Sequence, residues 1–367
     1  MTKEALEDQM LNIVVRREEP EKEDQRQNNL KDFIENRDKL RQTENEILLL
    51  ITESKNEILK DEALIDVLNR SKNESALLEE RLAKAEIDQE NLEKIRNLYK
   101  DAARRVSNLF FILGELANIE YMYQFSMEFH INLYHQAISN AAREQKNYRI
   151  NAITQNFTTL FYENINRSLL EHHKLIFSFL IVLRIMQYET NKASANEIRF
   201  FMLGGTAPEK STPTELKNII TNKQWGVINE LSQNLEVFQG FAEDCKRLRR
   251  ELGRYFSNFK EALPLPWSNR ISAFQKLILV RILHPEKLIS YIQNMIIEEL
   301  GRKFIESTPF NLHQAYSDSS PTTPIILILS PGVDPLGDLS LLCDKISNKG
   351  NLYVRALGIQ FFIYKLR

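Results

Sequence analysis

The sequence predicts a mainly α-helical protein with a long antiparallel helical hairpin, further helical segments and a short α/β start at its C-terminus. Three observations predict this fold class. The 367-residue chain has neither Gly nor Pro from Glu21 to Leu113, and these two residues disfavour helix interiors most strongly. Apolar blocks with helical spacing continue from Ala102 to about Leu300. The apolar run Ile325–Leu329 lies between proline-containing turns, which is typical of a short buried strand.

The overall composition argues against several classes of protein. Lys and Arg number 48 against 50 Asp and Glu, so the net charge of −2 gives no general attraction to nucleic acid or to an anionic membrane. The N-terminus has no apolar signal segment, and the most apolar run, Leu175–Met186, is too short to span a bilayer. Cys245 and Cys343 lie far apart in no metal-binding or redox spacing, which suits a reducing compartment. We therefore expect a soluble, intracellular protein with neither a nucleic-acid nor a membrane partner.

The region without Gly or Pro predicts two helices, about Glu23–Ile51 and Asp61–Leu98, folded back on each other. The residues between them, Thr52–Asn56, compete with helical backbone for hydrogen bonds, and Asp61 could cap the second helix. Apolar residues partly fit a coiled-coil seam: Leu30, Phe33, Leu40 and Ile47 in the first helix, and Leu64, Leu68, Leu78, Leu82, Ala85 and Leu92 in the second.

The seam is imperfect, because Arg37, Glu44, Ser71 and Ser75 lie on or near it. This pattern favours a weakly packed antiparallel hairpin over a parallel dimer, since a dimer needs sustained heptads. A solvated helical pair with no special role fits the same pattern and stays open as an alternative.

Beyond the hairpin the chain becomes rich in aromatic residues. An amphipathic block at 102–131 must be buried, and Arg143–Asn147 resembles a connector. We expect helix again over Ile150–Tyr188. A short helix at Asn196–Leu203 is predicted to end at Gly204-Gly205, because glycine readily adopts the left-handed conformation of a helix C-terminus.

The next segments alternate linker and helix. Thr206–Thr214, with two prolines among polar residues, is the best candidate for a linker. A second helical region is expected over 215–300, with an interruption at Leu263–Trp267. Glu306–Pro321 is expected to be loop, and the strand follows it.

The turn after the predicted strand resembles a phosphate-binding loop in position but not in chemistry. Such a loop needs glycines for close backbone approach, a lysine for the phosphates and a hydroxyl for Mg²⁺. Here Ser330, Pro331 and Gly332 are followed by Asp334, whose carboxylate repels phosphate, and no Gly-Lys-Ser/Thr occurs. We therefore expect no nucleotide binding at this turn. An ordinary strand–turn–helix without nucleotide ancestry is the alternative.

Other groups of reactive residues are sparse. His172-His173 and the pair His130/His135 do not have the i, i+4 spacing of a helical metal site, so we expect no metal. No nucleophile motif occurs, and we predict no catalytic residue. The basic run Lys246–Arg250 is diluted by acidic neighbours and is expected to be a solvated face. Nucleic-acid binding through this run is a remote alternative that would require salt-sensitive affinity.

Several blocks, in this order along the chain, resemble sequences of one family. The family patterns are Gly-Leu-Glu-Asp-Gln-Leu-Leu, an acidic-Pro step, Asp-Pro-Met-Tyr-Gln-Tyr-Ser, Trp-x-Phe-Leu-Leu-x-Gly-Gly and a final strand with its approach. The matching residues are Ala5–Leu11, Arg17–Pro20, Leu116–Ser126, Ile198–Gly205, Phe274–Arg281 and Thr323–Pro335. The chain thus resembles a dynein heavy chain, the ATP-driven microtubule motor with a ring of six AAA+ modules. The Leu-Glu-Asp-Gln and Met-Tyr-Gln-Phe-Ser blocks favour the axonemal branch.

The resemblance implies a division of the chain into five parts. Residues 1–20 would close the large subdomain of the fifth AAA+ module, and 21–100 would form the strut, or buttress, that braces the microtubule-binding stalk. Residues 101–205 would belong to the small subdomain of the fifth module, and 206–320 would be a helical linker toward the sixth. Residues 321–367 would be a truncated start of the sixth module, a P-loop-like α/β unit that binds no nucleotide in this family.

The resemblance also implies a role and partners. The segment would transmit force and would not hydrolyse ATP, so no cofactor is expected for it, although the family uses ATP and Mg²⁺. The strut tip would contact the stalk through Thr52, Glu53, Lys55, Asn56 and Lys60. Partners would be the rest of the ring and stalk, and at family level intermediate chains, light chains and microtubules. The expected location is the cytoskeleton of the cytoplasm, in the axoneme of a cilium or flagellum. A stand-alone coiled-coil scaffold that binds a partner through residues 23–98 is the competing interpretation.

Two departures from the family pattern matter. After Leu357-Gly358 the family continues Gln-Gly-Gln-Gly-Pro, whereas residues 359–367 do not match, so we expect a truncated or mis-spliced product. Ala5 replaces a glycine in the first block. A shortened sixth module would leave Ile325–Leu329 with exposed strand edges that favour aggregation.

Overall fold

In the computed structural model the chain forms two compact units, Met1–Ile305 and Glu306–Arg367. The described residues are 2–53, 62–142, 146–205, 208–213, 216–217, 219–257, 263–306, 311–319, 325–328, 332–346, 354–357 and 360–363. Helices dominate both the order of elements and the residue total, so the prediction of a mainly α-helical protein is confirmed. Among these residues, no helix is long and apolar enough to cross a bilayer.

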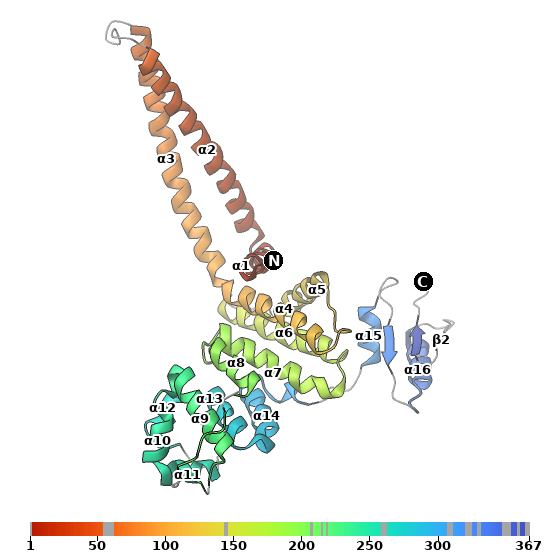
Figure 1. Ribbon diagram of the computed structural model, residues 1–367. Helices are drawn as coiled ribbons and strands as arrows, with labels where there is room; N and C mark the ends of the chain where they lie inside the picture. The colour runs from red at the N-terminus through yellow and green to blue at the C-terminus, as the bar shows by residue number, and fades with distance from the viewer. Residues whose placement is uncertain are drawn as a thin grey trace. The chain divides into compact units, whose positions relative to one another are not determined.

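The first unit begins with three helices, α1 (Lys3–Glu18), α2 (Pro20–Glu53) and α3 (Glu62–Leu98). Helices α2 and α3 lie side by side in Figure 1, and the start of α2 contacts the end of α3, so they run in opposite directions. With 34 and 37 residues, they are about 50 Å and about 55 Å long at 1.5 Å per residue. Proline occupies the first position of α2, where its missing N–H costs nothing.

The half-buried positions of α2 and α3 alternate in steps of three and four, which is the spacing of a coiled-coil seam. On α2 they include Lys22, Arg26, Asn29, Phe33, Asn36, Leu40 and Thr43; on α3 they include Ser75, Leu78, Leu82, Ala85, Gln89 and Leu92. The prediction that Leu30 lies in the seam is wrong, because its side chain is 43% exposed. Leu30 follows the seam residue Asn29 directly and is therefore rotated by about 100° away from the seam.

Four helices form the body next to this pair: α4 (Lys100–Ile119), α5 (Met127–Asn140), α6 (Lys146–Asn166) and α7 (Glu171–Tyr188). Helix α1 packs along α4 and buries Leu6, Met10 and Val14 completely. Helix α3 passes into α4 through Tyr99 alone. The expectation of one helix over 150–188 is wrong at residues 167–170, where α6 ends and α7 has not begun.

The rest of the first unit consists of shorter helices: α8 (Ala195–Leu203), α9 (Asn222–Asn234), η1 (Glu236–Phe238), α10 (Phe241–Arg247), α11 (Arg249–Ser257), α12 (Trp267–Arg270), α13 (Ala273–Leu283), η2 (Pro285–Lys287), α14 (Leu288–Glu299) and η3 (Arg302–Phe304). Gly204 ends α8 in the left-handed conformation, with φ of 81°, where the sequence predicts it. Phe304 returns to the body, where its ring centroid lies 4.6 Å from that of Tyr162.

The second unit contains α15 (Leu312–Asp318), β1 (Ile325–Ile328), α16 (Leu336–Ile346), β2 (Val354–Leu357) and β3 (Gln360–Ile363). Its strands follow the order β1-β3-β2, and β3 is antiparallel to both neighbours. The expectation of open edges on β1 therefore fails on one edge, where Ile325 lies level with Ile363. The expectation of loop over 306–321 is wrong at α15, whose first turn is capped by the side chain of Asn311.

Candidate functional site

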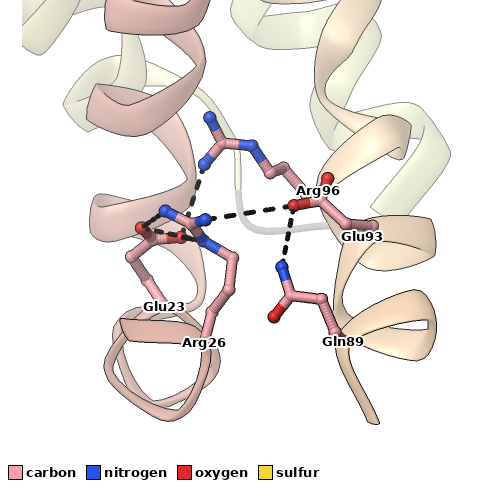
Figure 2. Close-up of polar contacts among 5 residues, drawn as sticks. All are labelled: Glu23, Arg26, Gln89, Glu93 and Arg96. Atoms are coloured by element: carbon pink, nitrogen blue, oxygen red, sulfur yellow. Dashed lines mark hydrogen bonds and ion pairs between the residues drawn. The ribbon is translucent and has the colours of Figure 1, made fainter. Parts of the chain in front are cut away.

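A cluster of charged and polar side chains lies where the two long helices meet the body. We call it the foot cluster; it consists of Glu23 and Arg26 of α2 and Gln89, Glu93 and Arg96 of α3 (Figure 2). Both helices point these side chains toward each other. Most charged residues of a two-helix hairpin face solvent, so charges between the helices call for an explanation.

Glu23 is the centre of the foot cluster. Its side chain is only 3% exposed, and both carboxylate oxygens accept hydrogen bonds from Arg26, whose Nη2 lies 2.7 Å from Oε1. Arg96 of the facing helix, 10% exposed, places Nη1 3.5 Å from Oε2 of Glu23. The carboxylate is thus held by one guanidinium from each helix.

Two weaker contacts extend the cluster toward solvent. Nη1 of Arg26 lies 3.9 Å from Oε1 of Glu93, and Nε2 of Gln89 donates to the same oxygen at 3.4 Å. Glu93 is 40% exposed, so water screens its attraction to Arg26 and this ion pair contributes little by itself. The ion pair matters mainly for the position of Arg26, because it brings this side chain into contact with both helices.

Opposing effects set the charge state of Glu23. Burial raises the pKa of its carboxyl, but the hydrogen bond and charge of Arg26 and the charge of Arg96 together lower it further, so the net pKa lies below the ordinary value of 4.5. The Glu23 hydrogen bond raises the pKa of Arg26. The cluster therefore holds an ionised carboxylate at neutral pH.

The joints just below the foot cluster are short. Only Glu19 separates α1 from α2, and only Tyr99 separates α3 from α4. Glu18 forms a two-point ion pair with Arg149 of α6, whose Nη1 also donates to the carbonyl of Ala141 at 2.8 Å. Burial, with the charges of Glu19 and Glu18, raises the pKa of Tyr99 to about 12, so its phenol stays neutral.

Helices α1 and α4 are joined to each other by both apolar and charged contacts. Besides the buried residues of α1, Glu7 lies 3.7 Å from Nε of Arg104 on α4. At the start of α1, Nζ of Lys3 lies 3.4 Å from the ring centroid of Tyr188. Each of these two body helices is thus joined almost directly to one of the long helices, α1 to α2 and α4 to α3.

The residues predicted for stalk contact lie at the far end of α2 or beyond it. The hydroxyl of Thr52 is exposed and donates to the carbonyl of Leu48 at 2.8 Å, and Glu53 is the last residue of the helix. Lys55, Asn56 and Lys60 lie outside the described residues. The prediction of a contact at this end stays untested.

Two of the four residues of the predicted phosphate-loop remnant are described. Gly332 has a φ of 88°, and the Oδ1 atom of Asp334 accepts a hydrogen bond from the backbone N–H of Leu336 at 3.0 Å. The carboxylate thus occupies one of the donors that open at the start of α16. Ser330 and Pro331 lie outside the described residues.

The basic run does not form one continuous helical face, because the chain leaves helix geometry at Leu248 between α10 and α11. Lys246 lies 5.7 Å from the ring of Trp225, and Arg247 pairs with Asp244 at 2.9 Å. His130 is buried among aromatic rings. Nδ1 of His173 lies 2.8 Å from the hydroxyl of Tyr123. Within the described ranges, no group of three His, Cys, Asp or Glu residues could hold a metal ion.

A cavity of about 280 Å³ lies between α8 and α9, and the sequence does not predict it. Its lining mixes polar and apolar side chains, among them Asn196, Arg199, Phe200, Leu203, Glu230 and Asn234. The foot cluster was also missed. A signal for it exists, since Arg26 and Arg96 lie in phase with the apolar seam residues, where a charge has to find a partner.

Comparison with known proteins identifies related sequences. Residues 1–78 match the family model described as the ATP-binding dynein motor region. Over 350 residues the chain is 34% identical to dynein axonemal heavy chain 3 of Mus musculus, a match that covers 94% of this chain. It is 31% identical over 361 residues to dynein axonemal heavy chain 2 of Homo sapiens, and 33% identical over 357 residues to dynein axonemal heavy chain 1 of Homo sapiens, matches that cover 97% and 96% of the chain. The chain spans about 8% of the length of these relatives.

Proposed function

Because the chain belongs to the dynein heavy chain family, with 31–34% identity to axonemal members over 94–97% of its length, we propose that it is a force-transmitting part of an axonemal microtubule motor. In this proposal α2 and α3 form the strut that braces the stalk, and the body helices form part of the ring wall. The proposed partners are the remaining ring and stalk, the intermediate and light chains, and microtubules, in the axoneme of a cilium or flagellum.

One observation carries the mechanical part of the proposal. Each long helix joins a body helix through a single residue, Glu19 or Tyr99, and the foot cluster ties the two helices together just above these joints. When α1 moves against α4, there is therefore almost no connecting segment whose change of conformation could absorb the movement. The motion has to pass into α2 and α3, which is what a strut requires.

We propose that the segment does not bind nucleotide itself. The turn before α16 lacks the Gly-Lys-Ser/Thr sequence of a phosphate-binding loop, and Asp334 directs its carboxylate to the helix N-terminus where a phosphate would bind. ATP and Mg²⁺ would act elsewhere in the motor. Titration of this chain with ATP and Mg²⁺ is expected to give no saturable binding. Micromolar affinity that disappears on Gly332→Val would contradict this part of the proposal.

The far end of the pair is the proposed contact with the stalk. Thr52 and Glu53 end α2, and Lys55, Asn56 and Lys60 follow in the sequence. Their opposite charges, together with the hydroxyl of Thr52 and the amide of Asn56, suit a polar contact that has to form and break, since exposed ion pairs are individually weak.

The proposal is tested in a full-length heavy chain that contains this sequence. Deletion of residues 36–42 and 77–83 removes one heptad from each helix and shortens the pair by about 10 Å without changing the foot cluster. We expect ATP binding to be retained and stimulation of ATP hydrolysis by microtubules to fall about tenfold. The matched control is Glu80→Gln, which removes an exposed pair with Lys84 and keeps the length. Full stimulation in the shortened motor would contradict the proposal.

A coiled-coil scaffold remains the competing function, and exposed apolar residues of α2 favour it. Leu48 and Leu49 near the end of α2 are 60% and 58% exposed, as a partner-binding surface would be. Light scattering of this chain distinguishes the two functions. A dimer that is lost on Leu48→Gln would support the scaffold, and a monomer would support the motor segment.

A further inference from the structure

The apolar seam of α2 and α3 has little power to fix which residues lie level with each other. Along α2, the seam residues between the foot cluster and Thr43 are apolar only at Phe33 and Leu40, which are one heptad apart; Asn29 precedes this pair and Asn36 lies within it. A helix whose apolar seam residues recur every seven positions presents the same pattern after a shift of seven residues.

The seam of α3 has the same ambiguity. Leu78, Ala85 and Leu92 follow one another at intervals of seven, so a slide of one heptad brings one apolar side chain into the place of another. The remaining seam positions, Ser75, Leu82 and Gln89, are a mixed series that includes two neutral polar side chains. Burial of apolar surface therefore distinguishes poorly between neighbouring registers, because nearly equal area leaves water in each.

The foot cluster does not repeat. The side chain of Glu23 is 3% exposed and is paired with Arg96 from the facing helix. Seven residues before and after Arg96 stand Gln89 and Ala103, neither of which carries a charge. A slide of one heptad would leave Glu23 with Arg26 alone and would leave the guanidinium of Arg96, 10% exposed, without a carboxylate. Leaving a buried charge without its partner costs far more than the exchange of one leucine for another.

We propose that the Glu23–Arg26–Arg96 cluster sets the register of α2 against α3, and that the rest of the seam allows a slide of one heptad when this cluster is broken. Arg26 binds the Glu23 carboxylate from the same helix, and Arg96 binds it from the facing helix only in the register seen here. The biological use of such a slide rests on the proposed function as a strut, but the physical claim concerns this chain alone. It can be tested without motor activity, so either proposal can fail while the other stands.

Cysteine cross-linking in the full 367-residue chain reports the register. Cys245→Ala and Cys343→Ser remove the two native thiols. Counting equally outward from the Glu23–Arg96 contact brings Asn36 level with Ala83, next to the seam residue Leu82. The pair Asn36→Cys with Leu82→Cys therefore reports the register seen here. Asn36→Cys with Gln89→Cys, and Asn36→Cys with Ser75→Cys, report slides of one heptad in either direction.

With Glu23 intact, we expect oxidation to link the 36–82 pair about tenfold faster than either shifted pair, because disulfide formation requires Cα atoms closer than about 7 Å. In Glu23→Gln this ratio should fall at least about fivefold as shifted pairs become populated. Glu80→Gln removes an exposed ion pair from α3 and should leave the ratio unchanged. A ratio that stays within about twofold in Glu23→Gln overturns the proposal.

A second set of variants separates a lost register from lost folding. Arg96→Lys keeps the charge opposite Glu23 and is expected to keep the ratio, whereas Arg96→Gln is expected to lower it as Glu23→Gln does. Circular dichroism measures whether each variant retains its helix content. If Glu23→Gln does not fold, the Arg96 pair decides: equal ratios in Arg96→Lys and Arg96→Gln overturn the proposal, and a lower ratio only in Arg96→Gln supports it.

Discussion

His130 lies in the core between α4, α5 and α6, with its ring edge-on to Phe110, Phe157 and Phe161. Its Nε2 lies 3.0 Å from the carbonyl of Val106, to which it donates. Burial lowers the pKa of His130 to about 4, while the Val106 hydrogen bond opposes the shift. The residue is therefore neutral when folded, and it gains a proton more readily when unfolded.

This difference predicts a pH dependence of stability. The folded pKa is depressed below the ordinary value of 6.5, so the unfolded chain binds more protons between pH 6.5 and about 4, and stability falls as the pH drops through that range. At pH 5 the loss is about 2 kcal/mol relative to pH 7.5. Urea unfolding at the two pH values measures it. His130→Gln keeps a donor for Val106 and should remove this loss, whereas His172→Gln, at an exposed position, should retain it.

The surroundings of Gly205 predict a loss of stability when this residue is replaced by alanine. Its φ is 69°, and a Cβ atom built there would lie 2.6 Å from Cγ1 of Val227. Gly240 has a φ of 81° but no atom within 4 Å of such a Cβ. Both Gly→Ala variants carry the cost of the left-handed conformation, about 1 kcal/mol, and Gly205→Ala adds a clash of about 1–3 kcal/mol. Thermal unfolding should rank Gly205→Ala well below Gly240→Ala; equal melting temperatures would contradict the clash.

At the scale of elements, α8 and α13 are coupled through their N-terminal caps. Ser194 and Glu197 cap α8, and Ser272 and Gln275 cap α13, each pair exchanging hydrogen bonds in a capping box. Nε2 of Gln275 also donates to Oε1 of Glu197 at 2.7 Å, and Glu197 is only 3% exposed. The two caps therefore form one buried unit, although α8 and α13 lie far apart in the sequence.

A double-mutant cycle tests this unit. Gln275→Ala removes one cap and also leaves the buried carboxylate of Glu197 short of a donor, so each single change costs more than a cap alone. We expect the pair Glu197→Ala and Gln275→Ala to show a coupling free energy of about 1–2 kcal/mol in urea unfolding. Ser126→Ala, which removes the isolated cap of α5, should show no coupling to Gln275→Ala. Additive costs at Glu197 and Gln275 would refute the coupling.

Individual elements explain why prediction from sequence worked in one place and failed in another. Helix over α2 and α3 was predictable, because no Gly or Pro interrupts that stretch. The break between α6 and α7 was not, because a distant residue defines it: the hydroxyl of Tyr123 accepts from the backbone N–H of Leu170 at 3.0 Å. No local pattern contains such a partner. The same reason hid the Glu23–Arg96 pair, whose two charges are 73 residues apart.

At the scale of the whole molecule, the chain divides after Ile305. The last turn before the division belongs firmly to the first unit, since Oγ of Ser178 donates to the carbonyl of Phe304 at 2.6 Å and the Phe304 side chain is only 6% exposed. The boundary therefore lies immediately after a buried aromatic residue, and its position is sharply testable.

Two truncations check this boundary. A chain that ends at Ile305 should unfold with the same urea midpoint as the first unit of the full chain, since it keeps Phe304. A chain that ends at Gly301 loses that ring and should be less stable by about 2–4 kcal/mol. Urea unfolding of the two chains measures this difference. Destabilisation of the chain ending at Ile305 by the same amount would mean that the second unit supports the first.

The single residue Tyr99 between α3 and α4 has a geometric consequence. Helix α3, about 55 Å long, acts as a lever arm whose pivot is this residue. A tilt of about 5° at the pivot moves the opposite end by about 5 Å, which approaches the 5.4 Å pitch of one helical turn. A small rearrangement near Tyr99 thus produces a larger displacement at the far end of α3, and this displacement grows in proportion to the length of the helix.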